Sequence, residues 1–155
     1  MASFSRVLVV AATLCVLGAI VGLKSTAGGS TGPAMIRIVD RQFGYTRVDL
    51  GPRGLTPGDS EIITTRLFNR KITQKPIGSG RFICTFTNGL NRTCIATISL
   101  PKGQLVASGN IRFRAFYNLA VTGGTGLYDN ARGTLTVIRT TRQPRREILV
   151  FRLSG

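Results

Sequence analysis

The sequence predicts an all-β protein, an eight-stranded antiparallel β-barrel, and three observations support this prediction. From Met35 onward no apolar pattern keeps the 3.6-residue period of a helix over a helical length. The chain instead shows short runs rich in Ile, Val, Thr and Phe, separated by Gly, Pro, Asn and Asp. Most of these runs are joined by turns of hairpin length, so consecutive strands should be antiparallel neighbours.

Eight strands are expected, at residues 35–43, 60–69, 80–87, 92–100, 103–113, 117–122, 133–142 and 147–153. In the clearest of them every second residue is apolar and faces a core. One face of the fourth run carries Cys94, Ala96, Ile98 and Leu100, and one face of the last carries Leu149, Phe151 and Leu153. Such strands could form a sandwich or an up-and-down barrel. The tight turns favour the barrel, because closure removes both sheet edges.

The connection between the first two expected strands is longer than the others. Residues 44–60, GYTRVDLGPRGLTPGDS, are rich in Gly and Pro and are predicted to form a loop. Long loops in compact domains often border a functional site.

The N-terminal segment predicts export. A basic residue precedes an apolar run at residues 7–23, and small residues at 25–27 offer a cleavage site. We therefore expect a signal peptide at residues 1–27, a flexible linker at 28–34 and a secreted barrel at 35–155. An uncleaved membrane anchor is the less favoured alternative, because the run is short for a membrane span of about 20 residues.

The chain is strongly basic, with 21 Lys and Arg against 6 Asp and Glu and a net charge of +15. Loss of Arg6 and Lys24 with the signal peptide leaves +13. Scattered basic residues usually form a solvated surface, but this excess predicts attraction to anionic surface polymers that weakens as salt rises. No specific nucleic-acid partner is expected, because Trp is absent and no aromatic series alternates with the basic residues.

Cys84 and Cys94 are the two cysteines outside the N-terminal apolar run, and in an exported protein such a pair indicates a disulfide. A hairpin centred on Gly89 would place them directly opposite each other, within disulfide range. The same turn contains Asn91-Arg92-Thr93, an N-glycosylation sequon at Asn91 that matters only under eukaryotic secretion. Otherwise it is an ordinary polar turn.

A glycine-rich loop, with Gly123, Gly124, Thr125 and Gly126, lies between the sixth and seventh expected strands. No helical pattern and no Gly-Lys-Ser/Thr motif follows it, which disfavours a phosphate site. Glycines here permit positive φ and close backbone approach, as at a barrel corner.

Residues 119–137, LAVTGGTGLYDNARGTLTV, resemble the signature of the allene oxide cyclase and dirigent proteins. In that signature a strand enters a V-x-G-G-T/S-G loop, and an A-R-G segment leads into the next-to-last strand. The likeness extends over residues 35–155. It implies a barrel whose lumen takes a small hydrophobic or phenolic molecule, in a homotrimer or a homodimer. It also implies either an isomerase that closes a ring or a dirigent-like protein that orients intermediates for stereoselective coupling.

The absence of His leaves carboxylates, tyrosines and arginines as candidates for chemistry. Arg132 matches the arginine of the A-R-G segment, and the resemblance implies that it holds the polar end of the lumen beside the glycine loop. The resemblance also implies an acid close to the glycine loop and an acidic residue of the first strand that faces the cavity, and Asp129 and Asp40 are the matching candidates for proton donor or acceptor. Tyr117 is a candidate phenolic donor. No cofactor and no metal ion is expected.

Each candidate also has a purely structural interpretation. Asp129 and Arg132 would form a surface ion pair, Asp40 a strand-end salt bridge, and Tyr117 a packing contact. Two functions therefore stay open: a barrel that binds an apolar or aromatic ligand and steers its cyclisation or coupling, and a non-enzymatic cationic protein that binds anionic envelope polymers.

Overall fold

The computed structural model of the chain describes residues 32–69, 75–112, 114–140 and 146–154. The expected signal peptide and the first part of the linker lie outside these residues. The elements are β1 (Met35–Val48), β2 (Ser60–Phe68), β3 (Gly78–Asn88), β4 (Asn91–Leu100), β5 (Gly103–Arg112), β6 (Phe116–Gly124), the 3-10 turn η1 (Gly126–Tyr128), β7 (Arg132–Arg139) and β8 (Arg146–Ser154). All eight expected strands are present, with ends displaced by a few residues.

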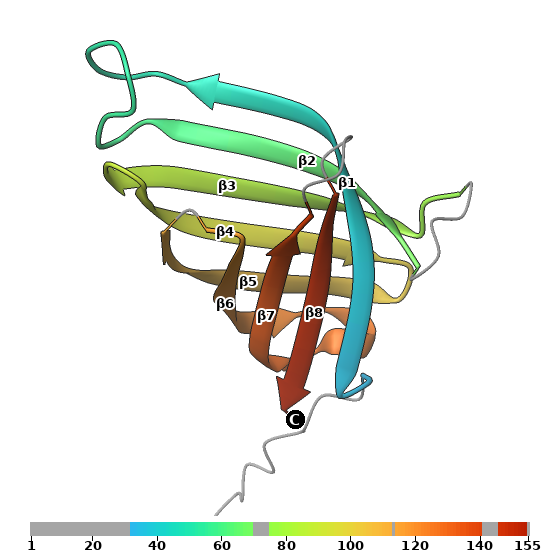
Figure 1. The fold of residues 1–155 in the computed structure, drawn as a ribbon. Helices are drawn as coiled ribbons and strands as arrows, with labels where there is room; N and C mark the ends of the chain where they lie inside the picture. Colours follow the sequence, from blue (N-terminus) through green and yellow to red (C-terminus); the bar gives the residue numbers. More distant parts are fainter. Residues whose placement is uncertain (1–31, 70–74, 113, 141–145, 155) are drawn as a thin grey trace, which may run out of the picture.

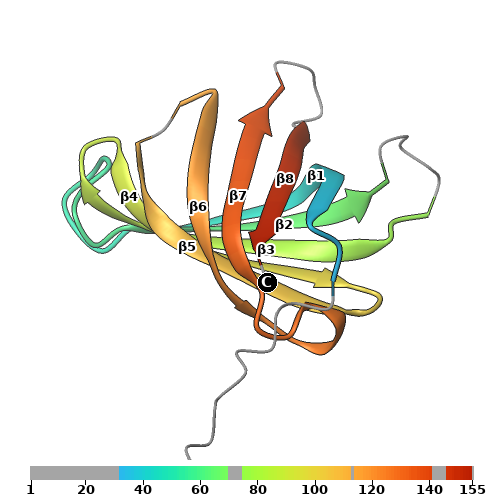
Figure 2. The same cartoon turned by 90° about the horizontal axis from the view of Figure 1, so that it is seen from below.

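Each strand is antiparallel to its neighbours in sequence, and β1 also pairs with β8, which closes the sheet into a barrel (Figures 1 and 2). The predicted eight-stranded antiparallel barrel is thereby confirmed. The first and last strands meet where the Leu153 N–H donates to the Ala34 carbonyl over 2.8 Å. No helix in the described part of the chain has the length and apolar character needed to cross a membrane.

The hairpin of β3 and β4 carries the predicted disulfide. Cys84 lies directly opposite Cys94 in the register, and a disulfide joins them. Gly89 has φ of 53° in the connecting turn, a conformation that favours glycine. Asn91, the sequon residue, is exposed at the start of β4. A disulfide of this kind is typical of proteins that fold in an oxidising compartment.

The first strand is longer than predicted, and the loop expected from residue 44 onward is wrong in its first part. Pairing with β2 continues to Val48, after a bulge at Phe43 that interrupts the register between Gln42 and Gly44. A bulge shifts the alternation of faces by one residue. Because of this shift and of the glycine at 44, the second half of β1 does not continue the period-two alternation of its first half.

Apolar side chains fill much of the barrel interior. The largest fully buried ones are Ile38, Leu67, Phe82, Ile98, Leu105, Leu119, Leu135, Leu149 and Phe151. Burial of each such side chain contributes about 1.5–3 kcal/mol to folding. The two ends of the barrel differ. β6 ends and β7 begins at the glycine-loop end, whereas β7 ends and β8 begins at the opposite end.

Candidate functional site

The structure divides the predicted site residues between the two ends of the barrel. Arg132 lies opposite Ser154, whereas Arg139, seven residues further along β7, lies opposite Glu147. At about 3.3 Å per residue these positions are roughly 23 Å apart. The glycine loop, Asp129 and Arg132 occupy the glycine-loop end, and Asp40 and Tyr117 occupy the opposite end. The predicted residues therefore do not form one cluster.

The glycine loop is held by the turn between β4 and β5. The Thr125 N–H donates to the Gln104 carbonyl and the Leu127 N–H to the Lys102 carbonyl, both over 2.9 Å. A side chain at Gly124 or Gly126 would collide with backbone carbonyl oxygens. These N–H groups are therefore engaged inside the protein, which supports the interpretation of the loop as a barrel corner. A ligand-binding role for the loop stays a prediction.

Asp129 and Arg132 are both exposed and make local contacts. Asp129 Oδ1 accepts a hydrogen bond from the Asn130 N–H over 3.0 Å, and Arg132 Nη1 donates to the Ala131 carbonyl over 2.9 Å. Among the described residues no ion pair joins the two side chains. A catalytic role for either one stays a prediction.

Ionisable side chains gather inside the opposite end of the barrel. We call them the polar belt: Asp40, Glu61, Arg92, Tyr117, Arg139 and Glu147. They come from six strands, β1, β2, β4, β6, β7 and β8. The side chains of Arg139 and Glu147 are 22% and 18% exposed, whereas Asp40, Glu61 and Arg92 are buried. The belt is thus in contact with solvent at one side and desolvated at the other.

Asp40 is the most deeply buried carboxyl of the belt, with 1% of its surface exposed. Its Oδ1 accepts a hydrogen bond from the Glu147 N–H over 2.8 Å, and the Thr65 hydroxyl lies close to the same carboxyl. Burial, followed by the negative charge of Glu147, raises the pKa of Asp40 from 3.8 to about 8. The Glu147 N–H, the Thr65 hydroxyl and the positive charge of Arg139 oppose this rise. Asp40 is therefore largely protonated at neutral pH.

Arg139 and Glu147 form an ion pair at the exposed side of the belt, with 2.8 Å between Nε and Oε1. Tyr117 lies close enough to both for their charges to act on its phenol. Burial is the main reason that the pKa of Tyr117 is raised, with a further contribution from the charge of Glu147. Tyr117 consequently keeps its proton and can donate a hydrogen bond throughout the ordinary pH range.

A second ion pair, Arg92 with Glu61, lies deeper in the belt. Both side chains are buried, and the Arg92 guanidinium also lies 5.2 Å from the centroid of the Phe86 ring. The Tyr45 hydroxyl donates to Glu61 Oε2 over 3.4 Å. Burial lowers the pKa of Arg92. A buried pair of this kind keeps two charges in place at a substantial desolvation cost.

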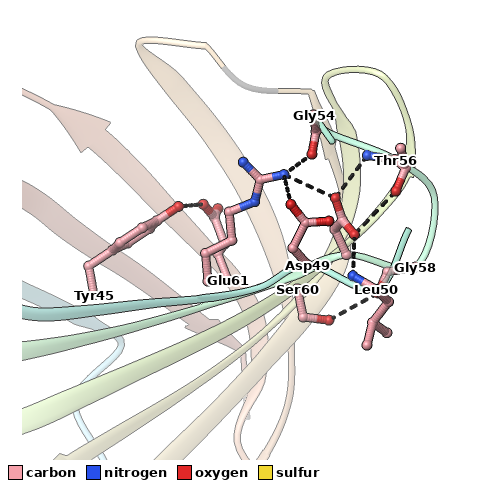
Figure 3. A network of polar contacts seen from close by, with 10 residues as sticks. Tyr45, Asp49, Leu50, Gly54, Thr56, Gly58, Ser60 and Glu61 are labelled. Atoms are coloured by element: carbon pink, nitrogen blue, oxygen red, sulfur yellow. Dashed lines mark hydrogen bonds and ion pairs between the residues drawn. The ribbon is translucent and has the colours of Figure 1, made fainter. Parts of the chain in front are cut away.

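A polar network holds the connection between β1 and β2. Figure 3 shows this network next to the Tyr45–Glu61 contact, at the ends of the two strands. The buried Asp59 carboxylate accepts hydrogen bonds from the N–H groups of Leu50 and Thr56, each over 2.9 Å. Arg47 lies 3.1 Å from Asp59 Oδ2 and also donates to the Gly54 carbonyl. This network gives the long connection beside the belt a defined shape.

Four belt residues were not predicted from the sequence, although a signal for three of them is present. Arg92 extends the inward series of Cys94, Ala96 and Ile98 by one step, and Glu147 extends that of Leu149 and Phe151. A charged residue on the extension of an apolar face is the sign of a polar barrel end. Arg139 likewise extends the series of Leu135 and Val137, and Glu61 continues the less regular series of Ile63, Thr65 and Leu67.

The belt offers the groups that general acid–base chemistry requires. Asp40 and Tyr117 carry protons, Glu147 and Glu61 are acceptors, and two arginines can stabilise negative charge on a bound molecule. In the ranges that the structure describes, no group of three or more His, Cys, Asp or Glu side chains is arranged to hold a metal ion.

Solved structures share the closed eight-stranded antiparallel barrel of this chain. A pyocyanin demethylase is 28% identical with a TM-score of 0.64, and the match covers 74% of this chain and 97% of that one. A pterocarpan synthase dirigent protein is 15% identical with a TM-score of 0.59, over 77% of this chain and 84% of that one.

A Diels-Alderase from Streptomyces koyangensis is 14% identical with a TM-score of 0.59, and the match covers 78% of this chain and 68% of that one. At 14% and 15% identity these two structures show a shared fold. No protein-family model and no curated protein sequence matches the chain.

Proposed function

We propose that the barrel binds a small apolar or aromatic molecule against the polar belt and steers its cyclisation or coupling by positioning it and by hydrogen bonds from the belt. The observation that carries this proposal is the buried carboxyl of Asp40, whose Oδ1 is fixed by the Glu147 N–H and which keeps its proton at neutral pH. A protonated carboxyl held in this way can donate a hydrogen bond to a ligand.

The surroundings of the belt suit an apolar ligand. The next inward residue on each of four belt strands is a buried apolar one: Ile38, Leu119, Val137 and Leu149. A ligand at the belt would therefore rest on apolar side chains and meet a few polar groups, which is how small-molecule sites are generally built. The names of the matching structures describe proteins that act on small organic molecules.

Two kinds of chemistry fit this arrangement. One is ring closure, as in the allene oxide cyclases that the sequence resembles, and the other is stereoselective coupling, as in dirigent proteins. In both, an apolar site restricts the conformations of the ligand while Asp40 or Tyr117 supplies or accepts a hydrogen bond. Export is part of the proposal, and the disulfide supports it.

The pH dependence of ligand binding tests the role of Asp40. Pyocyanin serves as the probe, and its affinity is measured by calorimetric titration from pH 6.5 to 9.5. We expect wild-type affinity to fall as pH rises through about 8, because Asp40 then loses its proton. Asp40→Asn stays neutral and should bind with an affinity that changes by less than about threefold over the same range.

Asp129→Asn is the matched control, because it removes an exposed carboxyl at the other end of the barrel and should follow the wild type. The groups that face Asp40, namely Glu147, Thr65, Arg139 and Tyr117, are unchanged in both variants. Identical pH profiles for the wild type and Asp40→Asn would remove Asp40 from the proposal. Failure of pyocyanin and of neutral aromatic probes to bind at all would overturn ligand binding itself.

A further inference from the structure

We infer that the outer face of β8, β1, β2 and β3 is a binding site for an anionic polysaccharide. Four outward-facing arginines, Arg146, Arg41, Arg66 and Arg81, form what we call the arginine row. Arg41 lies directly opposite Arg146 on one side and directly opposite Arg66 on the other. Arg81 lies opposite Thr64, two residues from Arg66, and so is its diagonal neighbour.

The four arginines of the row are closely spaced, so their positive charges repel one another. Neighbouring strands are about 4.8 Å apart, so the row crosses four strands within about 15 Å. Like charges directly opposite each other on neighbouring strands destabilise a sheet. A bound polymer with regularly repeated carboxylates would neutralise this repulsion.

The chain's acidic residues lie elsewhere, so the row has no carboxylate on its own face. Asp40, Glu61 and Glu147 belong to the polar belt inside the barrel. Asp49 and Asp59 lie in the connection between β1 and β2, and Asp129 follows η1. The outward positions of β8, β1, β2 and β3 therefore hold no acidic side chain.

Two arginines of the row are oriented by aromatic rings. The Arg66 guanidinium lies 5.1 Å from the centroid of the Phe43 ring, and that of Arg41 lies 5.6 Å from the Phe68 ring. Arg146 Nε is buried and has no hydrogen-bond partner among the described residues. Guanidinium groups held in this way lose less freedom when they bind, and their planar fork matches a carboxylate with two parallel hydrogen bonds.

The aromatic residues of this face favour a polysaccharide over other polyanions. Single-stranded nucleic acids need exposed rings on which bases stack. Here Phe68 is buried, and the exposed Phe43 lies beneath Arg66. Binding to a membrane surface needs a group of apolar side chains that enter the bilayer together. The two rings are engaged by arginines, and the exposed Met35 and Ile83 of this face lie far apart, because Ile83 is level with Thr46, eleven residues from Met35 along β1. An anionic polysaccharide needs neither stacking rings nor inserted apolar side chains, because the arginines alone can bind the carboxylates spaced along the sugar chain.

Fluorescein-labelled polygalacturonate tests this site through fluorescence anisotropy at low salt. Arg41→Gln/Arg66→Gln should weaken binding at least tenfold, because each arginine contributes a charge-assisted, two-pronged contact. Arg112→Gln/Arg114→Gln removes the same charge from exposed positions outside the row and should weaken binding less than about threefold. Urea unfolding should show that Arg41→Gln/Arg66→Gln is at least as stable as the wild type, because a repulsion is removed.

Equal losses in the two double variants would show that net charge alone binds the polymer, and would overturn the inference. Single-stranded DNA and phosphatidylglycerol vesicles are measured in parallel. Tighter binding of either one, with dependence on Arg41 and Arg66, would overturn the assignment to a polysaccharide. Because the row lies outside the barrel, pyocyanin binding should be unchanged in Arg41→Gln/Arg66→Gln, which separates this site from the polar belt.

Discussion

Asp40 links the folding stability of the barrel to pH. In the unfolded chain its pKa is near the ordinary value of 3.8, and in the barrel burial raises it to about 8. Between these values the folded state keeps a proton that the unfolded state has released. The free energy of unfolding therefore falls as pH rises from about 4 to about 8, and the contribution of the protonated acid is gone above that range.

Asp40→Asn should remove this pH dependence. At about 1.4 kcal/mol per pKa unit, the shift from 3.8 to about 8 sets an upper limit of about 6 kcal/mol for the effect, and relaxation of the belt reduces it. We expect the variant to be about 1–3 kcal/mol more stable than the wild type at pH 9 and no more stable at pH 4.5. Urea unfolding at both pH values measures this, with Asp129→Asn as the control. A variant less stable than the wild type at pH 9 would contradict the prediction.

The residues of the belt show what a sequence can reveal about a barrel site. Alternation identifies the face of a strand, whereas Asp40 was proposed from the family resemblance and Tyr117 from its phenolic hydroxyl. Alternation does not identify the end of the barrel at which a residue lies. That depends on the register of all eight strands, which brings Arg139 opposite Glu147 and Glu147 opposite Asp40.

The connection between β1 and β2 is an element organised by one carboxylate. The pKa of Asp59 is lowered, first by the hydrogen bond from the Thr56 N–H and then by that from Leu50. Because the pKa is lowered, Asp59 is fully ionised at neutral pH, and these hydrogen bonds then make their full contribution to the free energy of unfolding. It is lost as pH falls through the folded pKa, below the ordinary value of 3.8.

Asp59→Asn should loosen this connection without opening the barrel. Amide hydrogen exchange at neutral pH is the measurement, and we expect exchange at Leu50 and Thr56 to accelerate roughly tenfold, because hydrogen bonds to a charged acceptor are lost. The Phe86 N–H donates to the backbone carbonyl of residue 59 over 2.8 Å and should keep its protection. Ser60→Ala is the matched variant and should change neither. Unchanged exchange at Leu50 and Thr56 in Asp59→Asn would mean that the loop holds its shape by other contacts.

The elements that the sequence predicted best are those with regular alternation and short turns, above all β3 and β4. Their disulfide and their turn at Gly89 agree because one register satisfies both. β1 was predicted too short because its bulge places Phe43 between Gln42 and Gly44 and so breaks the period of two. A local pattern cannot predict such an irregularity, because the bulge is stabilised by pairing with β2.

At the scale of the whole molecule, the placement of the acidic side chains connects the inside of the barrel to its surface. Asp40, Asp59 and Glu61 are buried and Glu147 is half-buried, so few negative charges remain to balance the 21 Lys and Arg residues. Placing most of the acidic side chains inside the protein therefore has two results: it supplies carboxyl groups to the polar belt, and it leaves the outer surface basic.

The disulfide should stabilise the whole barrel and not only its hairpin. A closed sheet of this size is expected to unfold cooperatively, so a cross-link between β3 and β4 restricts the unfolded state of the entire domain. Cys84 and Cys94 are 10 residues apart, which corresponds to about 2–3 kcal/mol. Cys84→Ala/Cys94→Ala should lower the free energy of unfolding by at least this amount, because buried sulfur contacts are lost as well. Urea unfolding measures the loss, and the wild type under a phosphine reductant separates the cross-link from the packing. If strands far from the hairpin, such as β7 and β8, lost no protection from hydrogen exchange in the double variant, the barrel would not unfold as a single unit.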